Sequence, residues 1–284
     1  MAMVKSAAQT LKREVCLRGV GLHSGREANL RLSPALAATG IIFVRTDLPG
    51  CPALSATDVD PQAPPFRMTL KKGAAEIQTV EHLLASLSGL RITDCKIELD
   101  GLEVPGLDGS ALPFVTALRE AGTASLGASA PALTVDEPLA IEDSGASISV
   151  QPYPDALKIS YTLHYPGHPL AQGFFTCEIT EEVFIKELAP ARTFAIKKDA
   201  EAMRAAGLGR GANLQNTVVI DGTQVLETTL RFKDEPVRHK VLDLIGDLYT
   251  LGCPLHGHVI AKCSGHRHNR LLAGKLRTLV EACC

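Results

Sequence analysis

Residues 233–252, KDEPVRHKVLDLIGDLYTLG, have the features of one helix with a marked beginning and end. Asp234 suits the N-cap and Pro236 the first turn, where the missing proline N–H leaves no hydrogen bond unmade. Gly252 and Pro254 are typical of a helix end. Apolar residues at helical spacing predict one buried face, made by Val237, Val241, Leu244, Ile245, Leu248 and Leu251.

A row of polar residues runs beside the apolar face of this predicted helix. His239, Asp243 and Asp247 follow one another at intervals of four residues, so they lie one above the other. A His and an Asp one turn apart can bind a single metal ion, and a polar group one turn further on can support a ligand. His-x-x-x-Asp is common by chance, however, and a solvated helix face is its commoner explanation. A metal site therefore needs a further ligand from elsewhere.

Residues 79–90, TVEHLLASLSGL, predict a second helix, capped by Thr79 and ending near Gly89. Glu81 and His82 are adjacent in its first turn and point about 100° apart, so they cannot both bind one ion. His82 could bind a metal while Glu81 reaches the attacking water. With the His and Asp of the long helix this makes three protein ligands, the pattern of catalytic zinc. A capped helix with a buried imidazole is the alternative.

A third polar segment, KCSGHRHN at residues 262–269, predicts a turn between a strand and a helix. An imidazolium at His266 could stabilise an oxyanion or protonate a leaving amine. Asp247 would keep His266 charged, because a neighbouring carboxylate raises the pKa of an imidazole. The alternative is that His266 and His268 only form a polar turn.

Composition narrows the class of protein. A chain of 284 residues holds one large domain or two smaller ones, and its net charge of −2 gives no sign of nucleic-acid binding. No apolar run could span a bilayer, and residues 1–15 lack the apolar core of a signal peptide. Eight cysteines without a regular framework favour the reduced cytoplasm. Cys283 and Cys284 form no prenylation motif, since Glu281 stands where the modified Cys would be.

Residues 122–131, GTASLGASAP, are small, polar and rich in breakers, which predicts a boundary between domains at 1–125 and 132–284. Both halves run from strands, largely antiparallel, to helices, and this order predicts an α+β fold. Strands are expected on both sides of a turn at 21–25 and at 41–46, 94–99, 133–141, 146–153, 157–165, 173–179, 216–221 and 257–263. The other helices are expected between a cap at Asp108 or Ser110 and Gly122, and at 181–188, 198–207 and 268–281.

Six segments of the chain, in order and with matching spacing, resemble the UDP-3-O-acyl-N-acetylglucosamine deacetylase family. This family comprises the zinc amidases of lipid A synthesis in Gram-negative bacteria. The segments are GVGLHSG (19–25), TVEHL (79–83), EVPGLDGSALPF (103–114), APARTF (189–194), VRHKVLDLIGDL (237–248) and SGH (264–266). The resemblance covers nearly the whole chain.

The resemblance implies a Zn²⁺ site, with Fe²⁺ as the alternative ion. Its ligands would be His82, His239 and Asp243, with Glu81 as the general base. His266 would be the charged electrophilic or acid partner. The family fold implied is two similar α+β domains, each a mainly antiparallel sheet with helices, whose helical layers face each other in a β-α-α-β sandwich. The active site would lie between the two domains.

The resemblance also implies an acylated UDP-sugar substrate and a monomeric protein. Asp247 would orient the charged histidine, Thr193 would bind the oxyanion, and Lys240 would face the polar end of the substrate. Substrate-binding residues are expected at His23, Phe194 and Lys262. Two positions depart from the family pattern. Cys263 stands where a Lys often contacts the diphosphate, with Lys262 one residue earlier, and His256 stands where an apolar residue is usual.

An insert at about 195–218 is expected to form an apolar passage for the acyl chain. Its lining residues would be Ile196, Met203, Ala205, Ala206 and Leu208, although a core helix would have the same composition. Two other functions stay open. A different zinc amidase would share the metal site without the acyl passage, and a metal-free binding protein would leave the polar rows as solvated faces. Metal content and a panel of acylated and non-acylated UDP-sugars would separate these alternatives.

Overall fold

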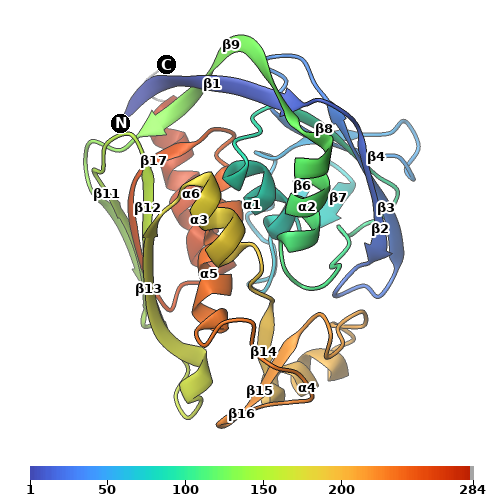
Figure 1. Cartoon of the computed structure of the whole chain (residues 1–284), viewed down its shortest axis with the longest axis vertical. Helices are drawn as coiled ribbons and strands as arrows, with labels where there is room; N and C mark the ends of the chain where they lie inside the picture. Colours follow the sequence, from blue (N-terminus) through green and yellow to red (C-terminus); the bar gives the residue numbers. More distant parts are fainter. Residues whose placement is uncertain (282–284) are drawn as a thin grey trace.

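A computed structural model describes residues 1–281, and it confirms the predicted α+β class. Two sheets lie on opposite sides of a central layer of helices, which is the predicted sandwich (Figure 1). The first sheet has antiparallel neighbours except for the parallel pair β4 and β8. Its strands, in spatial order, are β2 (Val15–Val20), β3 (Glu27–Pro34), β8 (Cys95–Leu99), β4 (Ile41–Arg45) and β5 (Ala53–Ser55).

The second sheet is organised around β17 (Leu255–Lys262), which pairs with β11 on one side and β12 on the other. Alternate residues of β17 are buried, as period-two patterning requires of a strand with one face on the core. The other strands are β1 (Ala2–Leu11), β9 (Thr123–Thr134), β11 (Ala146–Gln151), β10 (Leu139–Asp143), β12 (Leu157–His164) and β13 (Gln172–Glu178).

Most of residues 122–131, the expected boundary between domains, belong to β9. This strand pairs along its length with β1 in antiparallel orientation. The small side chains of β9 give no strand pattern, and its backbone pairing with β1 makes it a strand. The register shifts between Ala7 and Gln9, and Gly127 adopts a φ of 63°. Strand β1, from the first predicted domain, thus shares a sheet with β17 of the second. The division into two domains at this point stays a prediction.

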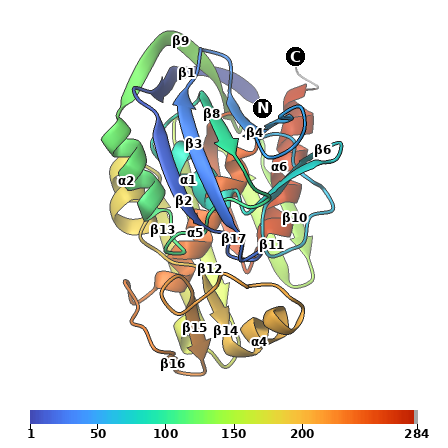
Figure 2. The same ribbon diagram turned by 90° about the vertical axis from the view of Figure 1, so that its right-hand side faces the viewer.

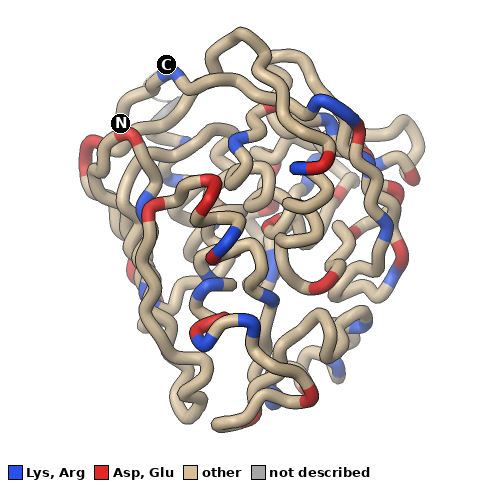
Figure 3. Tube along the Cα trace, viewed as in Figure 1, with Lys and Arg blue, Asp and Glu red and all other residues tan. Residues whose placement is uncertain are grey.

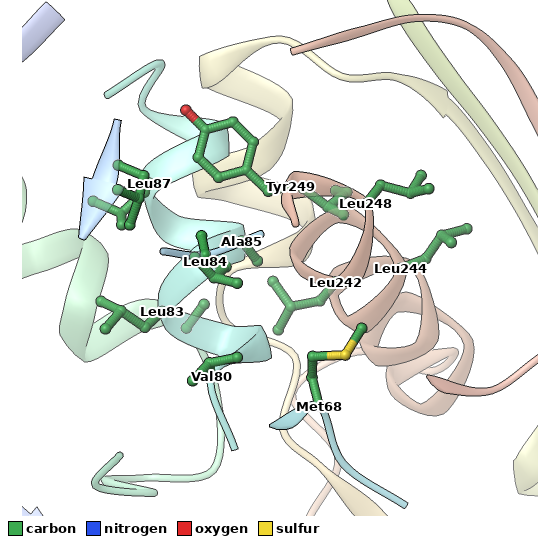
Figure 4. Packing of buried hydrophobic residues seen from close by; sticks show 14 of the residues in the cluster. Met68, Val80, Leu83, Leu84, Ala85, Leu87, Leu242, Leu244, Leu248 and Tyr249 are labelled. Atoms are coloured by element: carbon green, nitrogen blue, oxygen red, sulfur yellow. The ribbon is translucent and has the colours of Figure 1, made fainter. Parts of the chain in front are cut away.

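Two helices form the centre of the molecule, α1 (Glu81–Gly89) and α5 (Glu235–Tyr249). Figure 4 shows Leu84 and Ala85 of α1 turned toward Leu242 of α5, with Met68 beside them. Gly246 of α5 makes the closest approach, because a β-carbon there would lie 2.0 Å from the Glu81 carbonyl oxygen. The remaining helices of this layer are α2 (Leu112–Ala121), α6 (His266–Glu281) and α3 (Glu181–Val183), which continues as a π-helical turn over Phe184–Leu188.

The predicted helix caps do not form as expected. Asp234 occupies the N-cap of α5, but its carboxylate accepts a hydrogen bond from the Arg238 side chain instead of a helix N–H. Thr79 lies one residue before the N-cap of α1 and donates to Glu103. Ahead of α2, Asp108 and Ser110 form a local turn, in which the Ser110 hydroxyl accepts from a main-chain N–H two residues on. At α1 a distant partner, Glu103, therefore takes the place of local capping, and at α5 a side chain of the same helix does.

A small lobe projects from one end of the sandwich (Figures 1 and 2). It comprises β14 (Phe194–Ile196), α4 (Lys197–Ala205), β15 (Val218–Asp221) and β16 (Gln224–Val225). Ile196, Val218 and Ile220 form its own small core with Ala171 of the main body. The lobe includes the predicted insert at about 195–218 and extends beyond it. A separate hairpin in the first half is made of β6 (Thr69–Lys72) and β7 (Ala75–Gln78).

Acidic and basic residues are interspersed along the whole described trace, in line with the small net charge (Figure 3). None of the helices within residues 1–281 is both long and apolar enough to cross a membrane. His256, which carried no expected role, lies on β17 with its Nδ1 3.5 Å from the Thr134 hydroxyl. Cys283 and Cys284 lie outside the described residues.

Candidate active site

The packing of α1 against α5 brings three buried side chains to one point. His82 comes from the first turn of α1, and His239 and Asp243 come from successive turns of α5. Asp243 Oδ1 lies 3.2 Å from His239 Nε2 and 3.5 Å from His82 Nε2. One ligand atom from each residue lies within 4.8 Å of the other two. The structure therefore unites the three predicted metal ligands.

The chemistry of this cluster fits a divalent cation. His239 Nδ1 donates to the Ala191 carbonyl at 3.0 Å, which directs its other ring nitrogen into the cluster, as is usual for metal-bound histidines. Burial lowers the pKa of His239 to about 3, so the ring is neutral and able to bind a metal. Burial opposes ionisation of Asp243, but its interactions with the His239 ring and the Lys240 ammonium hold the pKa of Asp243 well below its usual range. Among the described residues, Asp243 Oδ1 has no hydrogen-bond partner.

Glu81 lies next to the cluster and is itself buried. Its Oε2 accepts a hydrogen bond from the Met68 main-chain N–H at 3.1 Å, and its Oε1 lies 3.9 Å from His266 Nε2. Burial raises the pKa of Glu81, because the charged carboxylate loses contact with water. A carboxylate with a raised pKa, held in place by the main chain, has the properties of a general base.

His266 is the first residue of α6 and faces the same space. Its Nδ1–H donates to Asp247 Oδ2 at 2.8 Å, and Asp247 is fully buried. Burial alone would lower the pKa of His266, but the charge and hydrogen bond of Asp247 raise it to about 9. His266 is therefore protonated at neutral pH and can donate a proton through Nε2.

Asn269 belongs to this network, and the sequence reasoning missed it. Its Nδ2 donates to Asp247 Oδ2 at 2.8 Å, while its Oδ1 accepts from the Ser264 hydroxyl at 3.0 Å. Asn269 comes three residues after His266, so helical spacing puts the two side chains on the same face of α6. That spacing was the available signal.

The turn at 189–193 is positioned by a buried ion pair that was also missed. Arg192 Nε lies 2.9 Å from Glu235 Oε1, and the same oxygen accepts from the Arg192 main-chain N–H. Glu235 is the first residue of α5, so the pair fixes the turn to the helix that carries two of the predicted metal ligands. Thr193 follows directly, and its N–H donates to the Gly109 carbonyl at 2.8 Å. Thr193 also lines a cavity of about 680 Å³ beside the cluster.

Lys240 and Phe194 lie beside each other and next to the cluster of His82, His239 and Asp243. Lys240 Nζ lies 2.7 Å from Asp243 Oδ2 and 5.8 Å from the centre of the Phe194 ring. Burial would lower the pKa of Lys240, but Asp243 raises it above its usual range, so the side chain is a permanent cation. The Phe194 ring also packs edge-on against His239 at 6.5 Å. Both residues line the same cavity as Thr193.

The cavity of about 680 Å³ connects the polar cluster with the small lobe. Its lining includes the polar residues Glu81, His82, Lys240, Asp243 and His266. From the lobe it includes the apolar residues Phe194, Met203, Leu214, Val219 and Leu226 and the charged residues Lys197, Asp199, Glu201 and Arg204. Of the five residues expected to line an acyl passage, only Met203 does so. Ile196 is buried in the core of the lobe, and Ala205, Ala206 and Leu208 do not line the cavity. Helical spacing alone could not show which face of α4 turns inward.

The remaining predicted substrate residues differ in position. His23 lines the cavity, and its main-chain N–H donates to Glu103 Oε1 at 2.9 Å. Glu103 also accepts from Ser24 N–H and the Thr79 hydroxyl, so this missed carboxylate fixes the turn at 21–25. Lys262 ends β17 with an exposed side chain and does not line the cavity. Cys263, Arg267 and His268 line it on that side.

The sequence was compared with known proteins. A sequence model of the UDP-3-O-acyl N-acetylglycosamine deacetylase family matches residues 8–278. A protein of Anaeromyxobacter dehalogenans named UDP-3-O-acyl-N-acetylglucosamine deacetylase is 43% identical over 271 residues, covering 94% of this chain and 86% of that protein. Proteins of the same name from Thermodesulfovibrio yellowstonii and Chlamydia caviae are each 40% identical. Their matches cover 97% and 98% of this chain, and 92% and 100% of those proteins.

Proposed function

The chain belongs to the UDP-3-O-acyl-N-acetylglucosamine deacetylase family, and from this premise we propose what it does and how. It is a hydrolytic enzyme of lipid A biosynthesis that removes the acetyl group from UDP-3-O-acyl-N-acetylglucosamine, giving UDP-3-O-acyl-glucosamine and acetate. The observation that carries this function is a single cavity that joins the His82, His239 and Asp243 cluster to a lobe that lines it with several apolar side chains. A substrate with both an acetyl amide and an acyl chain fits this cavity, since the amide can lie at the cluster while the acyl chain lies in the lobe.

His82, His239 and Asp243 would hold a divalent ion, with Zn²⁺ expected and Fe²⁺ as the alternative. Two imidazole nitrogens and one carboxylate oxygen are a ligand set of catalytic zinc sites. When bound, the ion would supply Lewis-acid polarisation of the amide carbonyl and of the attacking water. The hydrogen bond from His239 to the Ala191 carbonyl supports this assignment, because it orients a ligand without occupying its donor atom.

Glu81 takes the proton from water as the water oxygen attacks the acetyl carbon. The Met68 N–H holds one carboxylate oxygen, so the other is free to accept that proton. Burial raises the pKa of Glu81 toward the working pH, which is where a general base is most effective. Thr193 and Lys240 lie on the cavity wall, where a hydroxyl and an ammonium can stabilise the developing oxyanion.

His266 completes the reaction as the general acid. As the C–N bond breaks, the amine nitrogen receives a proton from His266 Nε2, which leaves the product amine and a carboxylate. Asp247 keeps the imidazole charged and fixes which nitrogen faces the substrate. Glu81 and His266, 3.9 Å apart, can therefore act on one amide group.

The lobe formed by β14, α4 and β15 would hold the acyl chain, and the apolar part of its lining, Phe194, Met203, Leu214, Val219 and Leu226, supports that role. His23 and Phe194 would contact the sugar or the acyl ester, since both line the cavity. We also expect a cytoplasmic monomer, which gel filtration and cell fractionation would test.

Hydrolysis assays of purified protein test the proposed function. Release of acetate from the acylated UDP-sugar, far faster than from UDP-N-acetylglucosamine, would support it. Equal rates on both compounds would favour a zinc amidase of another specificity. A protein that carries no metal and releases no acetate would instead be a binding protein.

A further inference from the structure

Arg67 is a buried cation without a hydrogen-bond acceptor in residues 1–281. The residue is 8% exposed, and its Nε and Nη1 are buried without a hydrogen-bond partner. Arginine side chains are always charged in proteins, so burial of one is not relieved by losing a proton. A buried charge without a partner is unfavourable, and proteins normally pair such groups.

The other two buried arginines of the described chain follow that rule. Arg45, 5% exposed, forms two hydrogen bonds of 2.9 and 2.8 Å with the carboxylate of Asp47. Arg192 is equally buried and pairs with Glu235 at 2.9 Å. Arg67 is the exception, and its missing partner points to an anion that comes from outside the chain.

Arg67 lies directly behind the wall of the catalytic cavity. Its guanidinium carbon lies 5.2 Å from the centre of the Phe66 ring, and the His23 ring lies 5.3 Å from the same ring. Phe66 and His23 both line the cavity. His23 is 6% exposed, and its Nδ1 is a second buried polar atom without a partner. Arg67 and His23, each with buried nitrogen atoms that lack a hydrogen-bond partner, thus both lie against the Phe66 ring.

The same segment is joined to the reaction centre. Met68, the residue after Arg67, donates its N–H to Glu81 Oε2 at 3.1 Å. The residue whose N–H binds Glu81 is therefore the direct neighbour of Arg67 in the chain. Amide hydrolysis at this site forms an anion, because the acetyl carbon gains the water oxygen, the C–N bond breaks, and the products are an amine and acetate.

We propose that Arg67 and His23 form a subsite that receives acetate after it is released from the substrate. The inference rests on the proposed deacetylase function. Guanidinium groups bind carboxylates through charge-assisted hydrogen bonds, and His23 Nδ1 can add a donor in the corresponding tautomer. Because Arg67 is only 8% exposed, the ligand we propose is a small carboxylate and not the bulkier diphosphate between a nucleoside and a sugar.

Thermal unfolding of the metal-loaded protein tests the subsite without measuring catalysis. Sodium acetate, compared with sodium chloride at equal ionic strength, should raise the Tm of the wild type in a saturable manner. Arg67→Met keeps an apolar stem but removes the charge, so its Tm should not respond to acetate. Without acetate, Arg67→Met should be at least as stable as the wild type, because it removes an unpaired charge. The matched control Arg45→Met should lose stability and keep the acetate response.

Product inhibition provides the second measurement. The inhibition constant of acetate should rise at least about tenfold in Arg67→Met, the expected loss for a hydrogen bond to a charged group. An unchanged acetate response in Arg67→Met, or an Arg67→Met protein that does not fold, would overturn the proposal. So would an Arg67-dependent Tm shift with UDP or inorganic phosphate but not with acetate. Absence of deacetylation, with the Arg67-dependent acetate response intact, would refute the proposed function and leave the subsite standing.

Discussion

A β-carbon on Gly246 of α5 would lie 2.0 Å from the main-chain oxygen of Glu81 on α1. The two helices therefore touch backbone to backbone at this point, and only glycine allows that distance. The contact lies one residue before His82 on α1 and three residues after Asp243 on α5. It thus sets the distance across which the three candidate ligands meet.

Gly246→Ala should force α1 and α5 apart. We expect a loss of about 1–3 kcal/mol in the free energy of unfolding, the usual cost of overpacking, together with weaker metal binding and lower turnover. Chemical denaturation and metal titration would measure these effects. Gly274→Ala on α6 is the control, because nothing lies within 4 Å of a β-carbon there. It should be neutral or stabilise the helix by about 0.5–1 kcal/mol. Equal stability of both variants would contradict the packing account.

Metal content tests the ligand assignment. Purified wild-type protein should carry close to one equivalent of zinc or iron, and chelation should abolish turnover. His239→Ala should lose the ion, since it removes one of three ligands. His256→Ala is a suitable control, because this histidine lies on β17 beside Thr134. Elemental analysis that found full metal content in His239→Ala would show that another residue holds the ion.

The pH–rate profile tests the acid. His266 must be protonated to act, so activity should fall as pH rises through its pKa of about 9. Asp247→Asn removes the carboxylate that favours the charged ring, and the alkaline limb should therefore move to lower pH. His266→Ala should lose rate and flatten that limb. An alkaline limb that is unchanged in both variants would assign it to another group, such as Lys240.

Acyl-chain length tests the role of the lobe. Each buried methylene contributes about 0.8 kcal/mol, so kcat/KM should rise about fourfold per methylene until the cavity is filled. A series of acylated UDP-sugars would measure this directly. A flat series would mean that the lobe does not bind the acyl chain.

The sequence predicted the elements that have strong local patterns. Periodic apolar residues identified α5, start and stop signals identified α1, and the spacing of His239 and Asp243 placed both on one face of α5. Residue chemistry connected His82 with that pair and His266 with Asp247, and the resemblance to a known family favoured these roles over the structural alternatives. Local patterns failed where a distant partner decides the structure, as in β9, whose small residues form a strand because β1 pairs with it.

Buried polar residues were the hardest part of the site to predict. Asn269, Glu103 and Glu235 resemble ordinary surface residues in the sequence, and only the folded chain shows what they hold. Glu103 fixes the turn that carries His23, and Glu235 fixes the turn before Thr193. The partners of Glu103 and Glu235 lie tens of residues away in the chain, so no spacing rule could reveal those two.

The central claim is that Glu81 is the base beside a metal ion that it does not bind. The most direct test measures metal content and deacetylation of UDP-3-O-acyl-N-acetylglucosamine in Glu81→Ala beside the wild type. We predict that Glu81→Ala keeps its full equivalent of metal and loses turnover by at least about a hundredfold, the usual scale of acid–base catalysis. Turnover close to that of the wild type, or loss of the metal with Glu81, would contradict the account.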